Sequence, residues 1–173
     1  METVKGPDSK EERITRMVSL YQLPLLRFCI MYLGDEDLAR DAVQETFIRA
    51  YRSLDGFRSG SSEKTWLTRI AINVCKNTVR TGWFRHVDRS VTPDMVAERP
   101  ALPDDADGCL TEALMGLPVR LKQAALLCWL QGMNQEEAAG ILGISRQAVG
   151  SRLNRARRKL RDALEGSDEH DPA

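Results

Sequence analysis

Residues Asn134–Leu153 read NQEEAAGILGISRQAVGSRL, a stretch with the pattern of two short helices joined by a tight turn. Asn134 is followed three residues later by Glu137, which is the spacing of a capping box at a helix start. Gly143 adopts a left-handed backbone at little cost, so it predicts a sharp turn after the first helix. Ser145 is then suited to cap the second helix. The stretch therefore predicts a helix-turn-helix.

The two predicted helices have different surfaces. The first has a small apolar face, made of Ala138, Ala139, Ile141 and Leu142. The second is anchored inward by Val149 and Leu153. Its outer face is polar and basic and consists of Arg146, Gln147, Gly150, Ser151, Asn154, Arg155 and Arg158. Such side chains read base edges in the major groove of DNA, whereas the alternative is a helical hairpin with a merely solubilising basic end. The glycine turn and the two caps favour DNA binding.

The net charge of the chain is zero, but the charges are sorted along it. Gly56–Ser90 is mainly basic, and Arg146–Arg161 contains no acidic residue. Val91–Met115, which lies between them, is acidic, as is the tail after Arg161. Two basic stretches separated by an acidic connector indicate two surfaces that face polyanions.

Apolar residues recur at three-to-four spacing along most of the chain, and no stretch shows the alternation of a strand. In the first half this periodicity predicts three helices, over Lys10–Leu33, Leu38–Leu54 and Glu63–Thr81. Pro24 is expected to kink or split the first of them. The core face of the second is predicted from its apolar residues, which are Leu38, Ala42, Val43, Phe47, Ala50, Tyr51 and Leu54.

From Phe84 to Asp107 the chain loses this periodicity and gains prolines and clustered aspartates, which is linker composition. A second helical region begins near Gly108. The sequence therefore predicts an all-α protein of two small helical domains joined by an extended linker. The expected boundaries are residues 11–84 and 108–165 for the domains, 85–107 for an acidic linker, and 1–10 and 166–173 for disordered ends.

Two helix faces in the first domain are candidates for partner surfaces. Ile48 lies on an otherwise polar face of its helix, which suggests contact with another molecule. The next helix carries a continuous stripe of donors without an acid, made of Arg69, Asn73, Lys76, Asn77 and Arg80. Because a merely solvated face usually alternates in sign, this stripe predicts contact with nucleic acid.

The sequence gives little support for an enzyme, a metalloprotein or a membrane protein. The first residues are polar and no apolar run spans a membrane, so we expect a cytoplasmic protein without membrane insertion. His86 and His170 are not at a metal-ligand spacing from any cysteine, and no catalytic triad or phosphate loop is apparent, so neither catalytic residues nor a cofactor or metal are expected. We expect buried free thiols at the cysteines, which are Cys29, Cys75, Cys109 and Cys128.

Motifs in both predicted domains resemble the bacterial sigma-70 family. The first domain resembles the second conserved region of that family at Asp41–Phe47, Phe57–Arg58 and Thr65–Asn73. The second domain resembles the fourth region over Glu137–Leu153 and Arg155–Arg157. Only these two regions are apparent, joined directly by the linker, which is the layout of the extracytoplasmic-function (ECF) class of sigma factors. Altogether the resemblance covers about Tyr21–Thr81 and Leu110–Leu164.

The resemblance implies a role that the residues alone do not reveal. Proteins of this class bind core RNA polymerase, direct it to promoters and help to melt the −10 element. The implied partners are the β′ clamp helices and the β flap of the polymerase, duplex DNA at the −35 element and single-stranded DNA at the −10 element. An anti-sigma factor that holds the free protein inactive is also implied. The acidic linker would follow an extended path that mimics RNA.

The resemblance also implies which residues carry each role. Core polymerase would be bound by Asp41, Gln44, Glu45 and Ile48. The −10 element would be bound by Phe57, Arg58, Ser61, Lys64, Arg69, Asn73, Lys76, Asn77 and Arg80, with the Phe57–Lys64 loop holding a flipped base. The −35 element would be bound by Arg146, Gln147, Ser151, Arg152, Asn154, Arg155 and Arg158.

The sequence departs from the family pattern at two places. Ala148 and Gly150 stand where the family often has threonine and a basic residue, so Gly150 removes an expected DNA contact. The loop Ser59–Ser62 is unusually small, which leaves its base preference open. A different class of function is a stand-alone helix-turn-helix regulator with an N-terminal dimerisation or sensing domain. The donor stripe from Arg69 to Arg80 argues against it, because a sensing domain does not need one.

Overall fold

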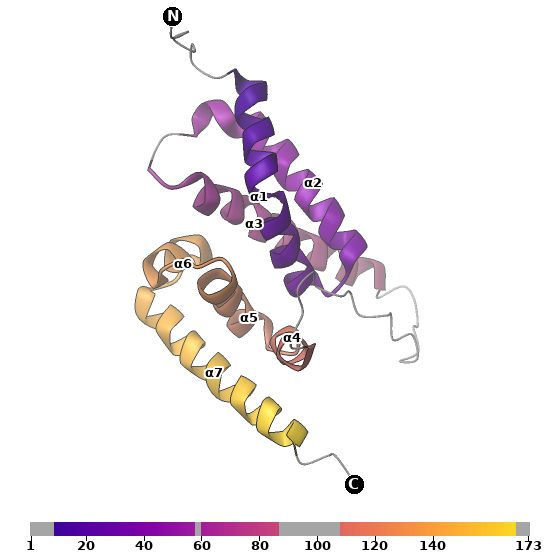
Figure 1. The fold of residues 1–173 in the computed structure, drawn as a ribbon, viewed down its shortest axis with the longest axis vertical. Helices are drawn as coiled ribbons and strands as arrows, with labels where there is room; N and C mark the ends of the chain where they lie inside the picture. The colour runs from indigo at the N-terminus through magenta and orange to yellow at the C-terminus, as the bar shows by residue number, and fades with distance from the viewer. Residues whose placement is uncertain (1–8, 58–59, 87–107, 169–173) are drawn as a thin grey trace, which may run out of the picture. The chain divides into compact units, whose positions relative to one another are not determined.

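The computed structural model describes residues 9–57, 60–86 and 108–168 (Figure 1). Every regular element in these ranges is helical, which confirms the predicted all-α class. The chain divides into two compact units: unit 1 comprises residues 1–29 and 36–93, and unit 2 comprises residues 30–35 and 94–173. The predictions of a disordered N-terminus, an extended linker and a disordered tail fall largely on residues 1–8, 87–107 and 169–173, which lie outside the described residues.

Three helices and a short turn account for the described part of the N-terminal half. They are α1 (Lys10–Leu33), α2 (Glu36–Ser53), the 3-10 turn η1 (Leu54–Gly56) and α3 (Glu63–His86). The bounds of α1 are those predicted, but α1 continues through Pro24 as one helix, so a split at this proline is wrong. Pro24 is exposed to solvent.

The helices of unit 1 pack around an apolar core. Its largest members are at most 2% exposed and include Met17, Leu25, Phe28, Leu54 and Leu67. Thr46 of α2 is also fully buried, and its hydroxyl donates to the Ala42 carbonyl 2.7 Å away. The polar atom of Thr46 is therefore satisfied within its own helix and does not weaken the core.

The predicted core face of α2 is only partly correct. Ala42, Val43 and Ala50 are buried, but Leu38 and Tyr51 are 43% and 39% exposed. The apolar arc of α2 is therefore wider than the surface that the rest of unit 1 covers. Helical periodicity marks which residues are apolar on one side, but it does not tell whether the cover comes from the same chain or from a partner.

Residues 108–168 of unit 2 contain four α-helices and one π-helical turn. They are α4 (Gly108–Met115), α5 (Val119–Ala125), the π-helical turn η2 (Leu126–Leu130), α6 (Gln135–Leu142) and α7 (Arg146–Asp168). The long helix α7 packs against α4, α5 and α6. One cluster of its core consists of Leu117, Leu121, Ala125, Ala156 and Leu160. Ala156 and Leu160 anchor the middle of α7 in this cluster, whereas Arg157, Arg158 and Lys159 between them are exposed.

Two helices extend beyond their expected ends. Residues 85 and 86, expected in the linker, are the last residues of α3, and residues 166–168, expected in the tail, are the last residues of α7. Neither stretch contains a proline that would stop the helix, and helix ends are the least well determined part of a sequence pattern.

Candidate nucleic-acid and partner surfaces

The helix-turn-helix forms in unit 2 as its sequence predicts. The Asn134 side chain accepts the Glu137 N–H at 2.9 Å, and the Asn134 N–H donates to a Glu137 carboxylate oxygen at 3.0 Å, which completes the capping box. Gly143 ends α6 with a φ of 66°, in the left-handed region. The Ser145 hydroxyl then accepts the Ala148 N–H at 3.1 Å at the start of α7. These contacts define the start of α6, its end at Gly143 and the start of α7, which follows α6 after a short turn (Figure 1).

The first turns of α7 separate an apolar face from a polar, basic one. Val149 is fully buried and Leu153 is 6% exposed, so this side anchors the helix. The opposite side carries exposed residues predicted to contact the −35 element: Arg146, Gln147, Ser151, Asn154, Arg155 and Arg158. Arg152, the remaining residue predicted for this surface, is half-buried. The exposed face of α7 therefore presents donors and acceptors without an acid over Arg146–Arg161.

A concave surface beside α7 adds a basic residue that the sequence analysis missed. It is lined by Pro118, Arg120, Leu121, Ala148, Ser151, Arg152, Arg155, Arg158 and Lys159. Arg120 comes from the first turn of α5 and joins the arginines of α7 across this hollow. The linear sequence does not reveal this pairing, because the two helices are separated by α6 and its turn. Four arginines and a lysine around one hollow favour an anionic ligand such as a phosphate backbone.

The donor stripe of α3 is exposed as predicted. Leu67, Ala71 and Cys75 are fully buried on the inner side of this helix. On the outer side Arg69, Asn73, Asn77 and Arg80 are exposed, and Lys76 is half-buried. Ser62 caps the helix, since its hydroxyl accepts the Thr65 N–H at 3.0 Å. A well-formed helix therefore holds these donors in one line.

The loop before α3 is anchored by an aromatic contact. The rings of Phe57 and Trp66 lie with their centroids 4.6 Å apart and their planes at 31°. Trp66 is only half-buried, and its ring packs on that of Phe57. Ser61 and Lys64, which precede Trp66 in the sequence, are half-buried. Arg58 lies outside the described residues. Aromatic rings next to a cationic stripe are the elements with which proteins bind unpaired bases.

The residues predicted to bind core polymerase lie together on the outer side of α2. Asp41, Gln44 and Ile48 are exposed, with Ile48 at 38%, and Glu45 is half-exposed. The Glu45 carboxylate accepts from the Arg49 guanidinium at 2.6 Å, one turn further along α2. Gln44 and Ile48 also line a groove against α1, whereas Asp41 and Glu45 do not.

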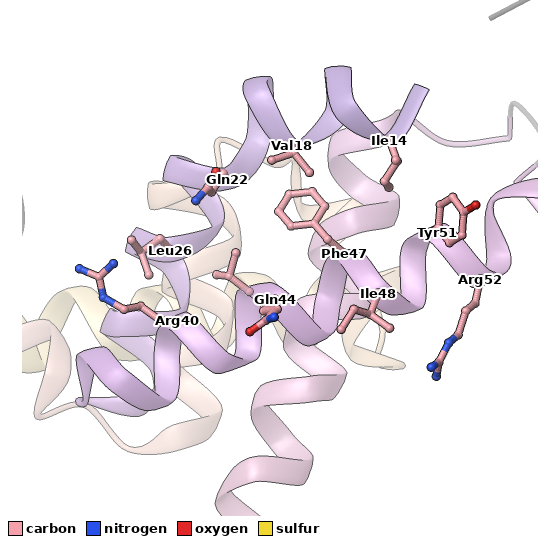
Figure 2. Close-up of a pocket in the computed structure, with 11 residues that line it drawn as sticks. Ile14, Val18, Gln22, Leu26, Arg40, Gln44, Phe47, Ile48, Tyr51 and Arg52 are labelled. Carbon is pink, nitrogen blue, oxygen red and sulfur yellow. The ribbon is translucent and has the colours of Figure 1, made fainter. Parts of the chain in front are cut away.

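The groove runs between α1 and α2 and has a volume of about 740 Å³. Figure 2 shows the Phe47 ring of α2 pointing toward Val18 of α1, with Ile14 nearby. Its remaining lining residues are Gln22, Leu26, Arg40, Val43, Gln44, Ile48, Tyr51 and Arg52. The contribution of α1 to this groove was not predicted, because the sequence does not show which helix lies beside the outer face of α2. The groove has an apolar floor and arginines in its lining, which suits a partner with both apolar and acidic side chains.

Two of the four cysteines are buried as predicted, and two are not. Cys29 and Cys75 are fully buried in unit 1, where the Cys75 thiol donates to the Cys29 sulfur at 3.6 Å. This hydrogen bond, together with burial, raises the pKa of the Cys29 thiol well above its usual range. Cys109 is exposed and Cys128 is half-buried, so the prediction of buried thiols is wrong there. Cys109 lies near the start of the short helix α4, which contributes no fully buried residue.

Two searches of the described residues were negative. No group of three or more histidine, cysteine, aspartate or glutamate side chains among them could hold a metal ion. None of the helices in that part of the chain is both long and apolar enough to cross a membrane.

Two family descriptions match the chain. Sigma-70 region 2 matches residues 17–85, and Sigma-70 region 4 matches residues 107–160. The RNA polymerase sigma-H factor of Pseudomonas aeruginosa is 32% identical over 163 residues, which cover 86% of this chain and 84% of that relative. The ECF RNA polymerase sigma-E factor of Escherichia coli K12 is 31% identical over 174 residues, which cover 92% of this chain and 90% of that relative.

A solved structure is similar as well. It is the sigma factor RpoE in complex with the anti-sigma factor NepR from Bartonella quintana, with a TM-score of 0.78 and 30% sequence identity. The similarity covers 88% of this chain and 97% of that one. The donor stripe of α3 lies within the part matched by region 2, and the helix-turn-helix lies within the part matched by region 4. The chain belongs to the ECF class of RNA polymerase sigma factors in the sigma-70 family.

Proposed function

We propose that this sigma factor binds DNA through two separate surfaces, one in each unit, and core polymerase through the outer side of α2. The observation that carries the proposal is the pair of exposed donor faces without an acid, one on α7 and one on α3. A stand-alone regulator needs only the first of them. A promoter-specificity subunit needs both, because it must hold duplex DNA and a melted strand at the same time.

The −35 element is bound by the exposed face of α7. Gln147 and Asn154 offer amides that pair with adenine, and Arg155 offers a guanidinium that pairs with guanine. Arg158 and Lys159, with Arg120 of α5, lie around the neighbouring hollow and neutralise phosphates there. The bases set the sequence preference and the phosphates set the affinity, so binding at this surface weakens as salt rises.

The −10 element is bound by α3 and the loop before it. Asn73 and Lys76 lie on the donor stripe, where they contact the bases and the backbone of the non-template strand. The Phe57 and Trp66 rings lie at the end of α3 from which a flipped base would approach. Extruding a base costs a few kcal/mol, which stacking and phosphate contacts along the stripe offset.

Core polymerase is bound by the outer side of α2, where Asp41, Gln44, Glu45 and Ile48 lie on one face. Exposed Ile48 is suited to an apolar contact at the centre, and the carboxylates of Asp41 and Glu45 are suited to basic partner residues around it. We assign this surface to the β′ clamp helices. The β flap is a second polymerase contact that we assign to unit 2.

An anti-sigma factor is a further partner that we propose for the free protein. The Bartonella quintana relative was solved in complex with the anti-sigma factor NepR. The groove between α1 and α2 includes Gln44 and Ile48, so a partner seated there also covers part of the polymerase-binding surface. We further propose that residues 11–84 and 108–165 are the two functional domains, that the protein performs no catalysis, and that it acts in the cytoplasm with the polymerase.

Binding of core polymerase by an Ile48→Asp variant tests the assignment of α2. A carboxylate at this exposed apolar position must be desolvated in the complex, so we expect the affinity to fall about tenfold or more. Val79→Asp is the matched control, because Val79 is an exposed apolar residue of α3, 48% exposed and outside the groove. The measurement is a titration of labelled core polymerase without DNA. Equal losses in both variants, or none in Ile48→Asp, contradict the assignment.

A further inference from the structure

The DNA-facing side of α7 lacks a side chain at its centre. Gln147, Gly150, Ser151 and Asn154 follow each other at i, i+3, i+4 and i+7, so they share one face of the helix. Gln147, Ser151 and Asn154 are exposed, and Gly150 is half-buried among them. Glycine has no side-chain donor or acceptor. Any side-chain hydrogen bond at the middle of this face must therefore come from a neighbouring residue that covers Gly150.

The side chain that covers Gly150 belongs to Gln135, the first residue of α6. A Cβ atom at Gly150 would lie 3.2 Å from the Gln135 Oε1 atom and 3.9 Å from its Cδ atom. The first of these distances is tighter than an ordinary van der Waals contact, so the amide of Gln135 occupies the space in which a side chain at position 150 would begin. The helix before the turn thus contributes a polar group to the face of the helix after it.

The backbone of Gln135 is held firmly in this place. Its neighbour Asn134 forms the capping box with Glu137, which fixes the first turn of α6. Gly143 and the Ser145 cap then set how α7 leaves the turn. The Gln135 residue is itself exposed, so it can meet a ligand at the surface of α7. Gln135 lies in the capped first turn of α6, next to the capped start of α7. Its backbone is therefore already ordered before a ligand binds, which favours recognition.

We propose that Gln135 is a specificity-determining residue for the −35 element, and that Gly150 is required because it leaves room for the Gln135 amide. The proposal rests on the assignment of α7 to the −35 element and extends the recognition surface to α6. A glutamine amide donates and accepts at once, which matches N7 and N6 of adenine in the major groove. Gln135 thus takes over a base contact that a side chain at position 150 would otherwise make.

A contact of Gln135 with a phosphate is the rival assignment. A phosphate contact fixes the position of the protein on the duplex but carries no base preference. Its loss weakens binding to every sequence alike, whereas the loss of a base contact relaxes the preference at one position. The base preference at every −35 position therefore distinguishes a base contact from a phosphate contact, whereas a single binding affinity does not.

The test uses the full chain assembled with core polymerase and a promoter library in which each −35 position carries all four bases. Transcript yield from each member gives the base preference at every position. Gln135→Ala and Gly150→Ala are compared with the native chain and with the double variant. Glu136→Ala is the matched control, because Glu136 is an exposed neighbour in the same turn of α6 and does not approach Gly150. Thermal unfolding of each variant monitors the fold.

In Gln135→Ala we expect the preference at one −35 position to fall about tenfold, with the other positions and the binding of core polymerase unchanged. Gly150→Ala should alter the preference at that same position, because its Cβ displaces the amide, and it should add nothing once Gln135 is alanine. Gln135→Glu, which keeps the shape of the side chain, should lose the adenine preference too.

An equal loss at all sequences in Gln135→Ala would show a phosphate contact and overturn the proposal. An unchanged profile would overturn it as well. A native chain that binds core polymerase but transcribes from no member of the library would contradict the proposed function itself. That outcome is distinct from a failure of Gln135 alone.

Discussion

Gly143 carries the turn of the helix-turn-helix in a left-handed backbone conformation. Its φ is 66°, and its N–H donates to the Ala139 carbonyl at 2.9 Å to close the end of α6. A side chain at this φ brings the Cβ close to the following carbonyl oxygen, which costs about 1–2 kcal/mol for an ordinary residue. The sharpness of the turn, and with it the approach of Gln135 to α7, therefore depends on a residue without a side chain.

Gly143→Ala should lower the free energy of unfolding by about 1 kcal/mol, because alanine must adopt the strained conformation. Gly140→Ala is the control, since Gly140 is exposed within α6 and has no positive φ. That change should stabilise the protein by up to about 1 kcal/mol through helix propensity. Urea unfolding followed by circular dichroism measures both. A Gly143→Ala variant as stable as Gly140→Ala would contradict the role of the turn.

The four cysteines should differ in reactivity toward a disulfide reagent that reports released thiolate. Cys109 is exposed and should react first, and Cys128 should follow slowly, because burial and then the nearby Glu137 carboxylate raise the pKa of its thiol. Cys29 and Cys75 should react only after unfolding, since both are fully buried. Mass spectrometry of the labelled peptides assigns each rate. Labelling of Cys29 or Cys75 at the rate of Cys109 would contradict the packing of unit 1.

Local signals at single residues were read well from the sequence. The capping box of Asn134 and Glu137 and the turn at Gly143 depend on neighbours within a few residues, so the local sequence is sufficient to predict them. The contact between Gln135 and Gly150 could not be read in this way. It joins two helices across the turn and becomes visible only when the crossing of α6 and α7 is known.

At the scale of the helix, α3 and α7 use the same design. Each buries one apolar side and exposes a row of donors without an acid, so each presents a basic face to a ligand. They differ in the group that accompanies the row. The aromatic pair of Phe57 and Trp66 lies at the start of α3, whereas the amide of Gln135 lies over Gly150, near the middle of the polar face of α7. Aromatic rings suit an unpaired base and an amide suits a base pair, which agrees with the assignment of α3 to melted DNA and α7 to duplex DNA.

Lys76→Ala on α3 and Arg155→Ala on α7 should therefore have opposite effects on two steps of initiation. Loss of the charged contact at Lys76 should reduce open-complex formation about tenfold, since a hydrogen bond to a charged group contributes about 1.5–3 kcal/mol. It should leave duplex binding at −35 nearly unchanged. Arg155→Ala should weaken duplex binding by a similar factor. Permanganate reactivity of unpaired thymines measures the first step, and a mobility shift with −35 duplex measures the second.

Each variant of this pair serves as the control for the other. If Lys76→Ala weakened duplex binding as much as Arg155→Ala, the division of labour between α3 and α7 would be wrong. A loss of helical content in either variant would show up in its circular dichroism spectrum. Since Arg155 is exposed and Lys76 is half-buried, we expect both to fold.

The helices themselves were largely predictable, but their covered faces were not. The bounds of α1 follow from its periodicity, and the exposure of the donor stripe follows from its charges. Leu38 and Tyr51 were expected in the core, yet both are exposed. An apolar residue reserved for a partner looks like a core residue in a single sequence, because both follow the same helical period.

At the scale of the molecule, the net charge is zero, but each of the two units carries its own basic surface. Unit 1 carries the donor stripe of α3 together with the groove between α1 and α2, and unit 2 carries the basic face of α7. Under the proposed function, each unit has a surface for DNA, and unit 1 also has one for the polymerase. Neither DNA surface alone recognises a promoter, because −35 and −10 elements are separate and only one of them is melted. Linking both to one polymerase raises the effective concentration of the second contact.

The most direct test of this account is transcription by purified bacterial core RNA polymerase with and without the protein, on templates with randomised −35 and −10 elements. The account predicts a stable complex with the core enzyme and transcripts that appear only in the presence of the protein. It also predicts that the selected templates show a preference at both elements. Absence of any complex with core polymerase, with undiminished duplex binding by a dimer of the free protein, would contradict it and favour a stand-alone regulator.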